Sequence, residues 1–270
     1  MPRLSAFIIT RNEARDLPVC LESLRALADE IVVVDDHSQD ATLEIARRYG
    51  ARTLTRALKG FADQKQFALE QTTGEWVLSI DADERVTPEL AKEILQIVIP
   101  GGRRPGIHQS GTTGLDSPPV AAGKDDNIAG YEIRRRFYFL GHLLQHGGLG
   151  RDWVLRLFRR TSGRFSDARV HEHIDVNGPV GRLVSPMEHF SYATLAEYVE
   201  KSNQYTSLAA QDLRQRGRHF TGIDCLRPVW ELLSRVVFKG AWLDGRPGLL
   251  YASLSAHTAW LRSLKLWELK

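Results

Sequence analysis

Two carboxylates directly follow an apolar run in this chain. The run 76–80 reads as a buried parallel strand, and Asp81 and Asp83 come just after its carboxyl end. Ligands of open α/β sheets bind at that end of the strands, where the two side chains can turn toward one point. Oxygen-only, anionic ligands suit a hard divalent cation, which with few protein ligands usually holds a substrate diphosphate. The segment also fits an acidic turn before a helix, because 87–90 resembles an N-cap followed by proline.

The residues before this motif alternate between short apolar strands and helical patterns. Further strands are predicted at 4–10, 30–34 and 51–55. Helices are predicted at about 17–27, 41–49 and 61–71, with Gly50 as the C-cap of the second. This β-α-β-α-β-α-β order predicts a mostly parallel, Rossmann-like α/β sheet with helices on both faces and right-handed crossovers.

A second pair of carboxylates, Asp35 and Asp36, ends the strand 30–34. Charged groups are rarely left at the ends of buried strands without a partner. Two strands of one parallel sheet that both end in carboxylates therefore predict a binding site at that edge of the sheet. The first strand is not followed by G-x-G-x-x-G, so a Rossmann dehydrogenase is disfavoured.

Three segments in this order resemble glycosyltransferase family 2, whose members have the GT-A fold. They are Ile8-Ile9-Thr10-Arg11-Asn12-Glu13, the stretch 33–40 and the stretch 74–84, all within the first hundred residues. Further on, the stretches 131–141, 156–160, 170–172 and 189–192 resemble a bacterial branch that includes lipopolysaccharide inner-core glucosyltransferases.

The resemblance implies a UDP-sugar donor and a Mg²⁺ or Mn²⁺ ion. It makes Asp83 the direct metal ligand and suggests that Asp81 contacts the donor ribose or sugar. Either Asp35 or Asp36 would accept the uracil N3–H. The pocket would be lined by Thr10, Arg11 and Glu13. Lys65 could contact the base or a phosphate, or could equally be a solvated helix charge.

Inverting transfer needs a base that takes the proton of the acceptor hydroxyl. In the family this carboxylate follows a Gly-aromatic segment in the acceptor half, and here Gly163-Arg164-Phe165 precedes Glu172. Glu172 is therefore the predicted base, although His171 stands where the family usually has a second acid. The alternative is that Glu172 only pairs with Arg164 or Arg169.

His189 is the histidine predicted to complete the metal shell or hold the diphosphate, again by resemblance to the bacterial branch. His171 and His173 lie in the same half, and for each of the three a structural role is an open alternative. On a strand, Arg134 and Arg136 share one face. Together with Arg156 they predict an anionic acceptor, because arginine binds phosphate and carboxylate bidentately. A solvated, charge-protected edge strand is the alternative.

Composition and charge fit an ordinary globular enzyme. The chain has 270 residues, is 43% hydrophobic and carries a formal net charge of +3, too mild to imply nucleic acid. Its two cysteines form no disulfide framework, which favours a reducing compartment. We find neither a signal-peptide pattern nor an apolar run that could span a bilayer. A cytoplasmic protein, peripheral at the inner face of the cytoplasmic membrane, is expected.

The C-terminal region is basic and rich in tryptophan. Four of the six tryptophans are Trp230, Trp242, Trp260 and Trp267. Basic, amphipathic helices of this kind lie at membrane interfaces and attract anionic headgroups. Alternatively, the aromatic residues pack these helices onto the catalytic domain or a second subunit. Gly240 and the stretch 244–248 are expected to divide the region into two or three helices.

We therefore expect four regions. These are a nucleotide-sugar-binding half (1–99), an irregular Gly- and Pro-rich insertion that is a lid or a spacer (100–129), an acceptor-binding half (130–195) and a C-terminal helical appendage (196–270). The predicted function is inverting transfer of a hexose, with glucose favoured, from a UDP-sugar to a lipopolysaccharide inner-core or related glycan or glycolipid. Alternatives are transfer to polyprenyl phosphate or a polypeptide side chain, and a non-catalytic nucleotide-sugar-binding module.

Overall fold

The computed structural model describes residues 3–99, 127–150, 152–165 and 174–269. Its chain forms two compact units. The first comprises Met1–Arg135 and Trp153–Glu188, and the second comprises Arg136–Asp152 and His189–Lys270. Two strands, β6 (Gly130–Phe139) and β12 (Met187–Tyr192), run from one unit into the other. The C-terminal helices themselves begin at Leu195.

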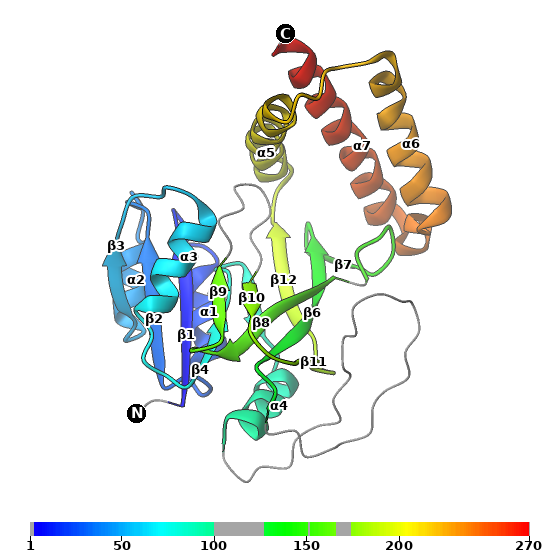
Figure 1. The fold of residues 1–270 in the computed structure, drawn as a ribbon. Helices are drawn as coiled ribbons and strands as arrows, with labels where there is room; N and C mark the ends of the chain where they lie inside the picture. Colours follow the sequence, from blue (N-terminus) through cyan, green and yellow to red (C-terminus); the bar gives the residue numbers. More distant parts are fainter. Residues whose placement is uncertain (1–2, 100–126, 151, 166–173, 270) are drawn as a thin grey trace. The chain divides into compact units, whose positions relative to one another are not determined.

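Four parallel strands form one end of the sheet in the first unit (Figure 1). They are β1 (Leu4–Thr10), β2 (Glu30–Asp35), β3 (Arg52–Thr55) and β4 (Trp76–Ser79). Strand β1 pairs in parallel with both β2 and β4, and β2 pairs in parallel with β3. The order β3-β2-β1-β4 brings the ends of β2 and β4 to the two sides of the end of β1.

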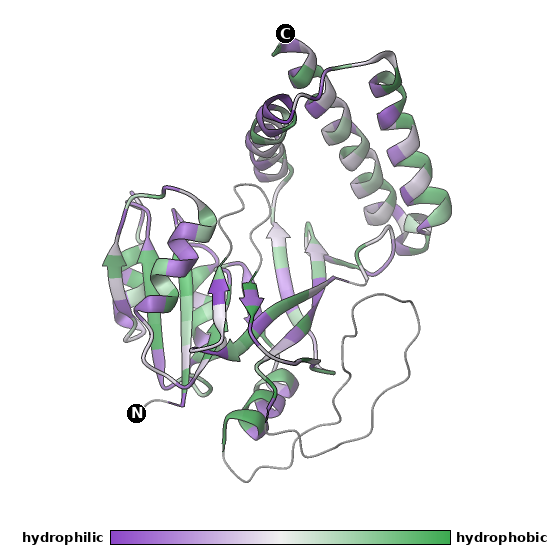
Figure 2. Ribbon diagram, in the orientation of Figure 1, coloured by the Kyte–Doolittle hydropathy of each residue, from purple (hydrophilic) through white to green (hydrophobic). Residues whose placement is uncertain are grey.

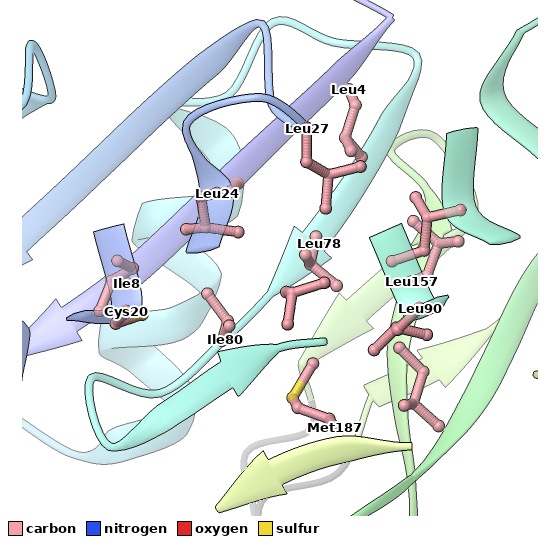
Figure 3. Packing of buried hydrophobic residues seen from close by; sticks show 14 of the residues in the cluster. Leu4, Ile8, Cys20, Leu24, Leu27, Leu78, Ile80, Leu90, Leu157 and Met187 are labelled. Atoms are coloured by element: carbon pink, nitrogen blue, oxygen red, sulfur yellow. The ribbon is translucent and has the colours of Figure 1, made fainter. Parts of the chain in front are cut away.

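Helices cover both faces of this sheet, as predicted. The intervening helices are α1 (Leu17–Leu24), α2 (Thr42–Arg48) and α3 (Phe61–Glu70). One core cluster joins alternate residues of β1, such as Leu4 and Ile8, to α1 and α2 (Figure 3). The residues between them, such as Phe7, pack with α3 in the other cluster. This period-2 alternation is what a strand buried on both faces requires.

Antiparallel strands extend the sheet beyond β4. Strand β8 (Trp153–Arg159) pairs antiparallel with β4, and β6 pairs antiparallel with β8. The acidic motif leads into β5 (Glu84–Val86) and then α4 (Pro88–Val98). Thr87 caps α4 by accepting a hydrogen bond from the backbone nitrogen of Leu90, as the sequence predicts. The remaining short strands are β9 (Gly163–Phe165), β10 (Ile174–Val176) and β11 (Val180–Arg182).

The second unit combines short strands with a helical region. Its core packs the end of β6 and β7 (His142–Leu144) against α5 (Leu195–Gln215) and α7 (Gly245–Glu268), and Phe139 lies at its centre. Between these two helices lie η1 (Gly222–Leu226), α6 (Arg227–Leu233), a turn of π-helix called η2 (Ser234–Phe238) and η3 (Ala241–Asp244).

The predicted break at Gly240 is confirmed, because this residue has a φ of +67°. The break expected at 244–248 is also confirmed, because η3 ends at Asp244, Gly245 has a φ of +66°, and α7 begins at Gly245 with Pro247 in its first turn. Proline is tolerated there because the first-turn backbone nitrogens have no partner within the helix. Over the part of the chain that the structure describes, no helix has the length and hydropathy needed to cross a membrane.

Candidate active site

Asp35 and Asp36 lie at the carboxyl end of β2, beside the end of β1. Thr10 and Asp35 are register partners, and the Thr10 hydroxyl donates to Asp35 Oδ1 at 2.9 Å. Asp35 is buried and also accepts the backbone N–H of Ser38 at 2.8 Å. These contacts fix the turn after β2, so that both strand ends present a rigid edge.

Asp36 is held from two sides and keeps some exposure. Its Oδ2 accepts from Arg11 Nη1 at 2.9 Å, and its Oδ1 accepts the backbone N–H of Leu58 at 3.0 Å. The backbone N–H of Glu13 donates to Thr42 Oγ1 at 2.8 Å, which ties the loop after β1 to the start of α2. The structure therefore brings the predicted nucleotide residues Thr10, Arg11, Glu13, Asp35 and Asp36 to one edge of the sheet.

The acidic motif lies at the end of β4, where its first carboxylate meets two cations. Asp81 Oδ1 is 3.1 Å from Lys65 Nζ on α3, and Asp81 Oδ2 is 2.5 Å from Arg156 Nη2 on β8. Both cationic side chains are buried, whereas the Asp81 side chain is 30% exposed. The carboxylate is thus partly exposed to solvent, while both of its cationic partners lie in the interior.

Glu84 is a buried carboxylate that extends this cluster. Its Oε1 lies 2.5 Å from Arg156 Nη2 and 3.2 Å from Arg135 Nη1, and its Oε2 accepts the backbone N–H of Asp81 at 3.0 Å. The cluster therefore contains the cations Lys65, Arg135 and Arg156 around two carboxylates. Asp81 is the partly exposed carboxylate of this cluster, whereas Glu84 is fully buried.

Charge pairing dominates the protonation of this cluster. Burial raises the pKa of Asp81, but Arg156 and Lys65 together hold it well below the usual 3.8. Burial lowers the pKa of Arg156, yet Asp81 and Glu84 raise it above its ordinary value. Cys20 of α1 donates from Sγ to the carbonyl oxygen of Asp81 at 3.6 Å. Burial raises its pKa, as do the neighbouring carboxylates, so the thiol stays neutral.

The residues of the acidic motif fit a divalent cation only with help from a substrate. Asp83 is partly exposed just beyond β4 and offers a hard oxygen donor. Asp81 is already committed to Lys65 and Arg156. Within the described ranges, no three His, Cys, Asp or Glu side chains gather as a metal cage. This donor set suits a Mg²⁺ or Mn²⁺ ion that takes its other ligands from a diphosphate and water.

The other predicted site residues are distributed over both units, and some lie outside the described residues. Arg156 belongs to the buried cluster, with 7% of its side chain exposed. Arg134 lies on β6 in the first unit, and Arg136 on the same strand belongs to the second. His189 is also in the second unit, where its Nε2 lies 2.8 Å from Ser191 Oγ. Glu172, with His171 and His173, lies outside the described residues.

Sequence reasoning missed the parts played by Glu84 and Arg135. It assigned Arg134 and Arg136 to the acceptor, whereas Arg135 is the member of the triplet that reaches Glu84. Alternation along β6 did place Arg135 on the other face. The signal in the sequence was Glu84, a third acid directly after Asp83. It closely follows an apolar run, and a buried carboxylate normally needs a cationic partner.

Comparisons with known proteins agree with this geometry. The model of the glycosyl transferase family 2 matches residues 5–103, the segment that builds the sheet edge and the acidic motif. The lipopolysaccharide core biosynthesis glycosyltransferase LpsC of Rhizobium meliloti (strain 1021) is 32% identical over 275 residues. That alignment covers 98% of this chain and 92% of the relative.

This chain belongs to glycosyltransferase family 2. It is therefore an enzyme of that family, as the sequence motifs indicate. The predicted GT-A fold is confirmed by the mostly parallel sheet between helices and the C-terminal helical region, together with the family match. A glycosyltransferase of Rickettsia typhi (strain ATCC VR-144 / Wilmington) is also similar, at 26% identity over 279 residues, covering 100% of this chain and 88% of the relative.

Two solved structures are further similar chains. The crystal structure of S. aureus TarS 1-349 is 18% identical, with a TM-score of 0.41, and covers 98% of this chain and 90% of that one. Glucosyl-3-phosphoglycerate synthase from Mycobacterium tuberculosis, in complex with Mn²⁺, UDP and phosphoglyceric acid, is 19% identical. Its TM-score is 0.36, and the match covers 49% of this chain and 43% of that chain.

Proposed function

We propose that this family 2 glycosyltransferase moves a hexose, with glucose as the expected sugar, from a UDP-sugar to a lipopolysaccharide inner-core or related cell-surface glycan, with inversion. The observation that carries the proposal is the similarity to LpsC along 98% of the chain. That similarity continues beyond the 5–103 segment of the family model into the half assigned to the acceptor.

The donor nucleotide is assigned to the edge formed by β1 and β2. Asp35 or Asp36 accepts the uracil N3–H, and the residues after β1 surround the nucleoside. In support, the turn after β2 is fixed by Thr10 and Ser38, so a base would meet preorganised groups. Asp36 is the partly exposed member of the pair, and its partner Arg11 lies largely in solvent. Measuring UDP affinity for separate substitutions of Asp35 and Asp36 would therefore show which of the two binds the base.

The diphosphate is assigned to the acidic motif. Asp83 would hold a Mg²⁺ or Mn²⁺ ion, which as a Lewis acid offsets the charge that builds on the departing UDP. Asp81 contacts the donor ribose or sugar, held in one orientation by Lys65 and Arg156. Lys65 also adds positive charge beside the diphosphate. These groups bind and orient the donor before the sugar–phosphate bond breaks.

The proposed acceptor is an anionic glycan that is anchored to lipid. Arg134 and Arg136 are proposed to bind its phosphates or carboxylates. The assignment of Arg156 to the acceptor stays a prediction. Its guanidinium already pairs with the carboxylates of Asp81 and Glu84. His189 is proposed to assist the metal or diphosphate, and Glu172 to take the acceptor proton. Because such an acceptor lies in a bilayer, the enzyme would act at an anionic membrane surface, on the cytoplasmic side.

A nucleotide-sugar screen tests the donor half of this proposal. The purified full chain is incubated with UDP-, GDP- and ADP-sugars, with and without Mn²⁺, and binding and slow hydrolysis are measured. We expect UDP-glucose to bind best, with metal-dependent release of UDP. Binding without any turnover, in the presence of acceptor as well, would support the non-catalytic alternative. Equal binding of all nucleotides, or of none, would contradict the donor assignment.

A further inference from the structure

The helix α6 and its π-helical extension η2 turn their apolar side chains outward. Leu226, Trp230, Leu233 and Val237 recur every three or four residues, which places them on one helix face. All four are exposed, and the Trp230 side chain is 63% exposed. Figure 2 shows hydrophobic colouring along much of this segment. A helix that faces water normally presents its polar side there.

Two charged residues of this segment, Glu231 and Arg235, pair within the second unit, whereas Arg227 at the start of α6 pairs with Asp224 and is 38% exposed. Arg235 Nε donates to Glu231 at 2.6 Å, and Arg235 Nη1 donates to the carbonyl oxygen of Gly147 at 2.8 Å. The guanidinium also lies over the ring of Tyr251, 5.3 Å from its centroid. Arg235 and its partner Glu231 are thus used for packing inside the second unit, and the apolar side chains named above are left outside.

The turn that follows continues the apolar surface. Phe238 is 72% exposed and lies 6.0 Å from Trp230, measured between ring centroids. Trp242 and Leu243 of η3 are also exposed. We call the outward residues together the apolar ridge: Leu226, Trp230, Leu233, Val237, Phe238, Trp242 and Leu243. Single exposed apolar residues are ordinary in proteins, but a contiguous set marks an interaction surface.

An open apolar groove adjoins the ridge. It has a volume of about 310 Å³ and lies between α6 and α7. Val229 and Leu232 of α6 line it, together with Ala256 and Trp260 of α7. Apolar surface therefore continues from the outer face of α6 onto its flank.

The charges around the ridge are complementary to an anionic surface. Lys239 and Arg246 are exposed on either side of η3. The neighbouring carboxylates are bound to partners within the unit. Asp244 contacts His146 Nδ1 at 2.7 Å and accepts backbone hydrogen bonds, and Glu231 binds Arg235. The exposed charge at the turn is therefore positive, which favours lipid headgroups that carry negative charge.

We propose that the apolar ridge inserts into the interface of an anionic lipid bilayer, with Lys239 and Arg246 at the level of the headgroups. Aromatic residues suit this position because their rings are amphipathic or bury large apolar area. The inference deepens the proposed function, since it names the surface by which the enzyme would reach a lipid-anchored acceptor. It also excludes Arg235 from headgroup binding, because that side chain is held inside the unit.

Co-sedimentation of the full chain with vesicles tests this inference. Phosphatidylcholine vesicles with and without phosphatidylglycerol are compared, for the wild type and for a F238S/W242S variant. We expect the wild type to bind the anionic vesicles and the variant to bind about tenfold or more weakly, because two large side chains no longer leave water. A K239E/R246E variant should lose roughly fivefold or more at low salt and little at high salt.

A matched control variant, V199S/L208S, removes two similarly exposed apolar side chains of α5 that lie outside the ridge. It should bind vesicles as the wild type does. Thermal unfolding and UDP affinity confirm that each variant is folded. Failure of the wild type to bind anionic vesicles, or equal binding by F238S/W242S, would overturn the proposal.

Sedimentation velocity separates the membrane from a second copy of the chain. One outcome is that the wild type is dimeric and does not bind vesicles, while the F238S/W242S variant is monomeric. That outcome would make the ridge a dimer interface and would reject the proposed membrane binding. The result is also independent of the proposed activity. Vesicle binding needs neither donor nor acceptor, and transfer to a detergent-free, water-soluble acceptor needs no vesicle.

Discussion

Among single residues, the two aspartates of the acidic motif differ in their surroundings, and different tasks are proposed for them. Asp81 is bound by Lys65 and Arg156, while Asp83 is partly exposed beyond the strand. A carboxylate with two cationic partners gives little to a metal ion, since its charge is already offset. The proposed account therefore gives the metal to Asp83 and the orientation of the donor to Asp81.

Replacing Asp83 by alanine should lower the transfer rate by at least about 10²–10³-fold, because the departing diphosphate loses its counter-charge. The effect of Mn²⁺ on UDP affinity, measured by calorimetry, should disappear as well. Glu89, an exposed acid in the first turn of α4, offers a control in E89A, which should keep both properties. Near-normal turnover of D83A would show that the metal is held elsewhere.

Glu172→Gln keeps the shape of the side chain and removes its ability to take a proton. We expect UDP-sugar affinity to stay nearly unchanged and kcat to fall by roughly 10²–10⁴, the usual contribution of a general base. Stopped assays of UDP release with acceptor give both quantities. Loss of donor affinity with a high residual rate would assign Glu172 to the donor site, and Asp152 and Asp175 would then be examined as the base.

The lowered pKa of Asp81 predicts how stability depends on pH. Its ionised form is stabilised by Arg156 and Lys65 against the opposing effect of burial, so folding lowers the pKa. The stabilisation is complete above the unfolded-state pKa of about 3.9 and is lost as pH falls toward the lower, folded-state value. The difference in free energy of unfolding between wild type and D81N should therefore shrink as pH drops below about 4. A difference that is constant with pH would contradict this.

At the scale of elements, Glu84 ties three strands together. It lies at the start of β5 and binds Arg156 on β8 and Arg135 on β6. Buried carboxylates of this kind leave uncompensated cations when they are removed. The network thereby couples the folding of the acidic motif to the antiparallel side of the sheet.

Glu84→Gln should reduce the free energy of unfolding by about 3–5 kcal/mol, the usual cost of breaking a buried ion pair from one side. Urea unfolding measures the loss. The exposed pair of Glu22 and Arg25, 3.7 Å apart, supplies the control, since E22Q should cost only about 0–1 kcal/mol. Equal losses in the two variants would mean that the Glu84 network adds little.

The sequence predicted the elements of the first unit well, because the signals are local. Apolar runs, Gly50 and the Thr87 cap determine where strands and helices begin and end, and each appears where expected. The partners of buried charges were not predictable in the same way. Arg135 and Glu84 are far apart in sequence, and only the antiparallel return of β6 and β8 brings them together.

In the C-terminal helices, too, the contacts of individual side chains could not be predicted from the sequence. Composition indicated basic, tryptophan-rich helices, but not which face of each helix is exposed. The inward position of Arg235 depends on Gly147 and Tyr251, which come from other parts of the second unit. Arg235 is held within the unit while Lys239 and Arg246 are exposed, so the membrane proposal uses Lys239 and Arg246.

At the scale of the whole molecule, family 2 motifs occupy the first unit and the apolar ridge occupies the second. The similarity to LpsC extends over both. The account thus joins a donor site built on a parallel sheet to a helical region suited to a lipid surface. In the proposed function, the chain transfers a sugar from a UDP-sugar to a lipopolysaccharide core acceptor.

Transfer of label from donor to acceptor tests the proposed function. The full chain is incubated with radiolabelled UDP-glucose, Mn²⁺ and lipopolysaccharide truncated in its inner core, and label in the lipid-bound glycan is counted against released UDP. The account predicts incorporation that matches UDP release, an inverted anomeric bond by NMR, and no incorporation by D83A. UDP release without label in the glycan, or label that persists in D83A, would contradict it.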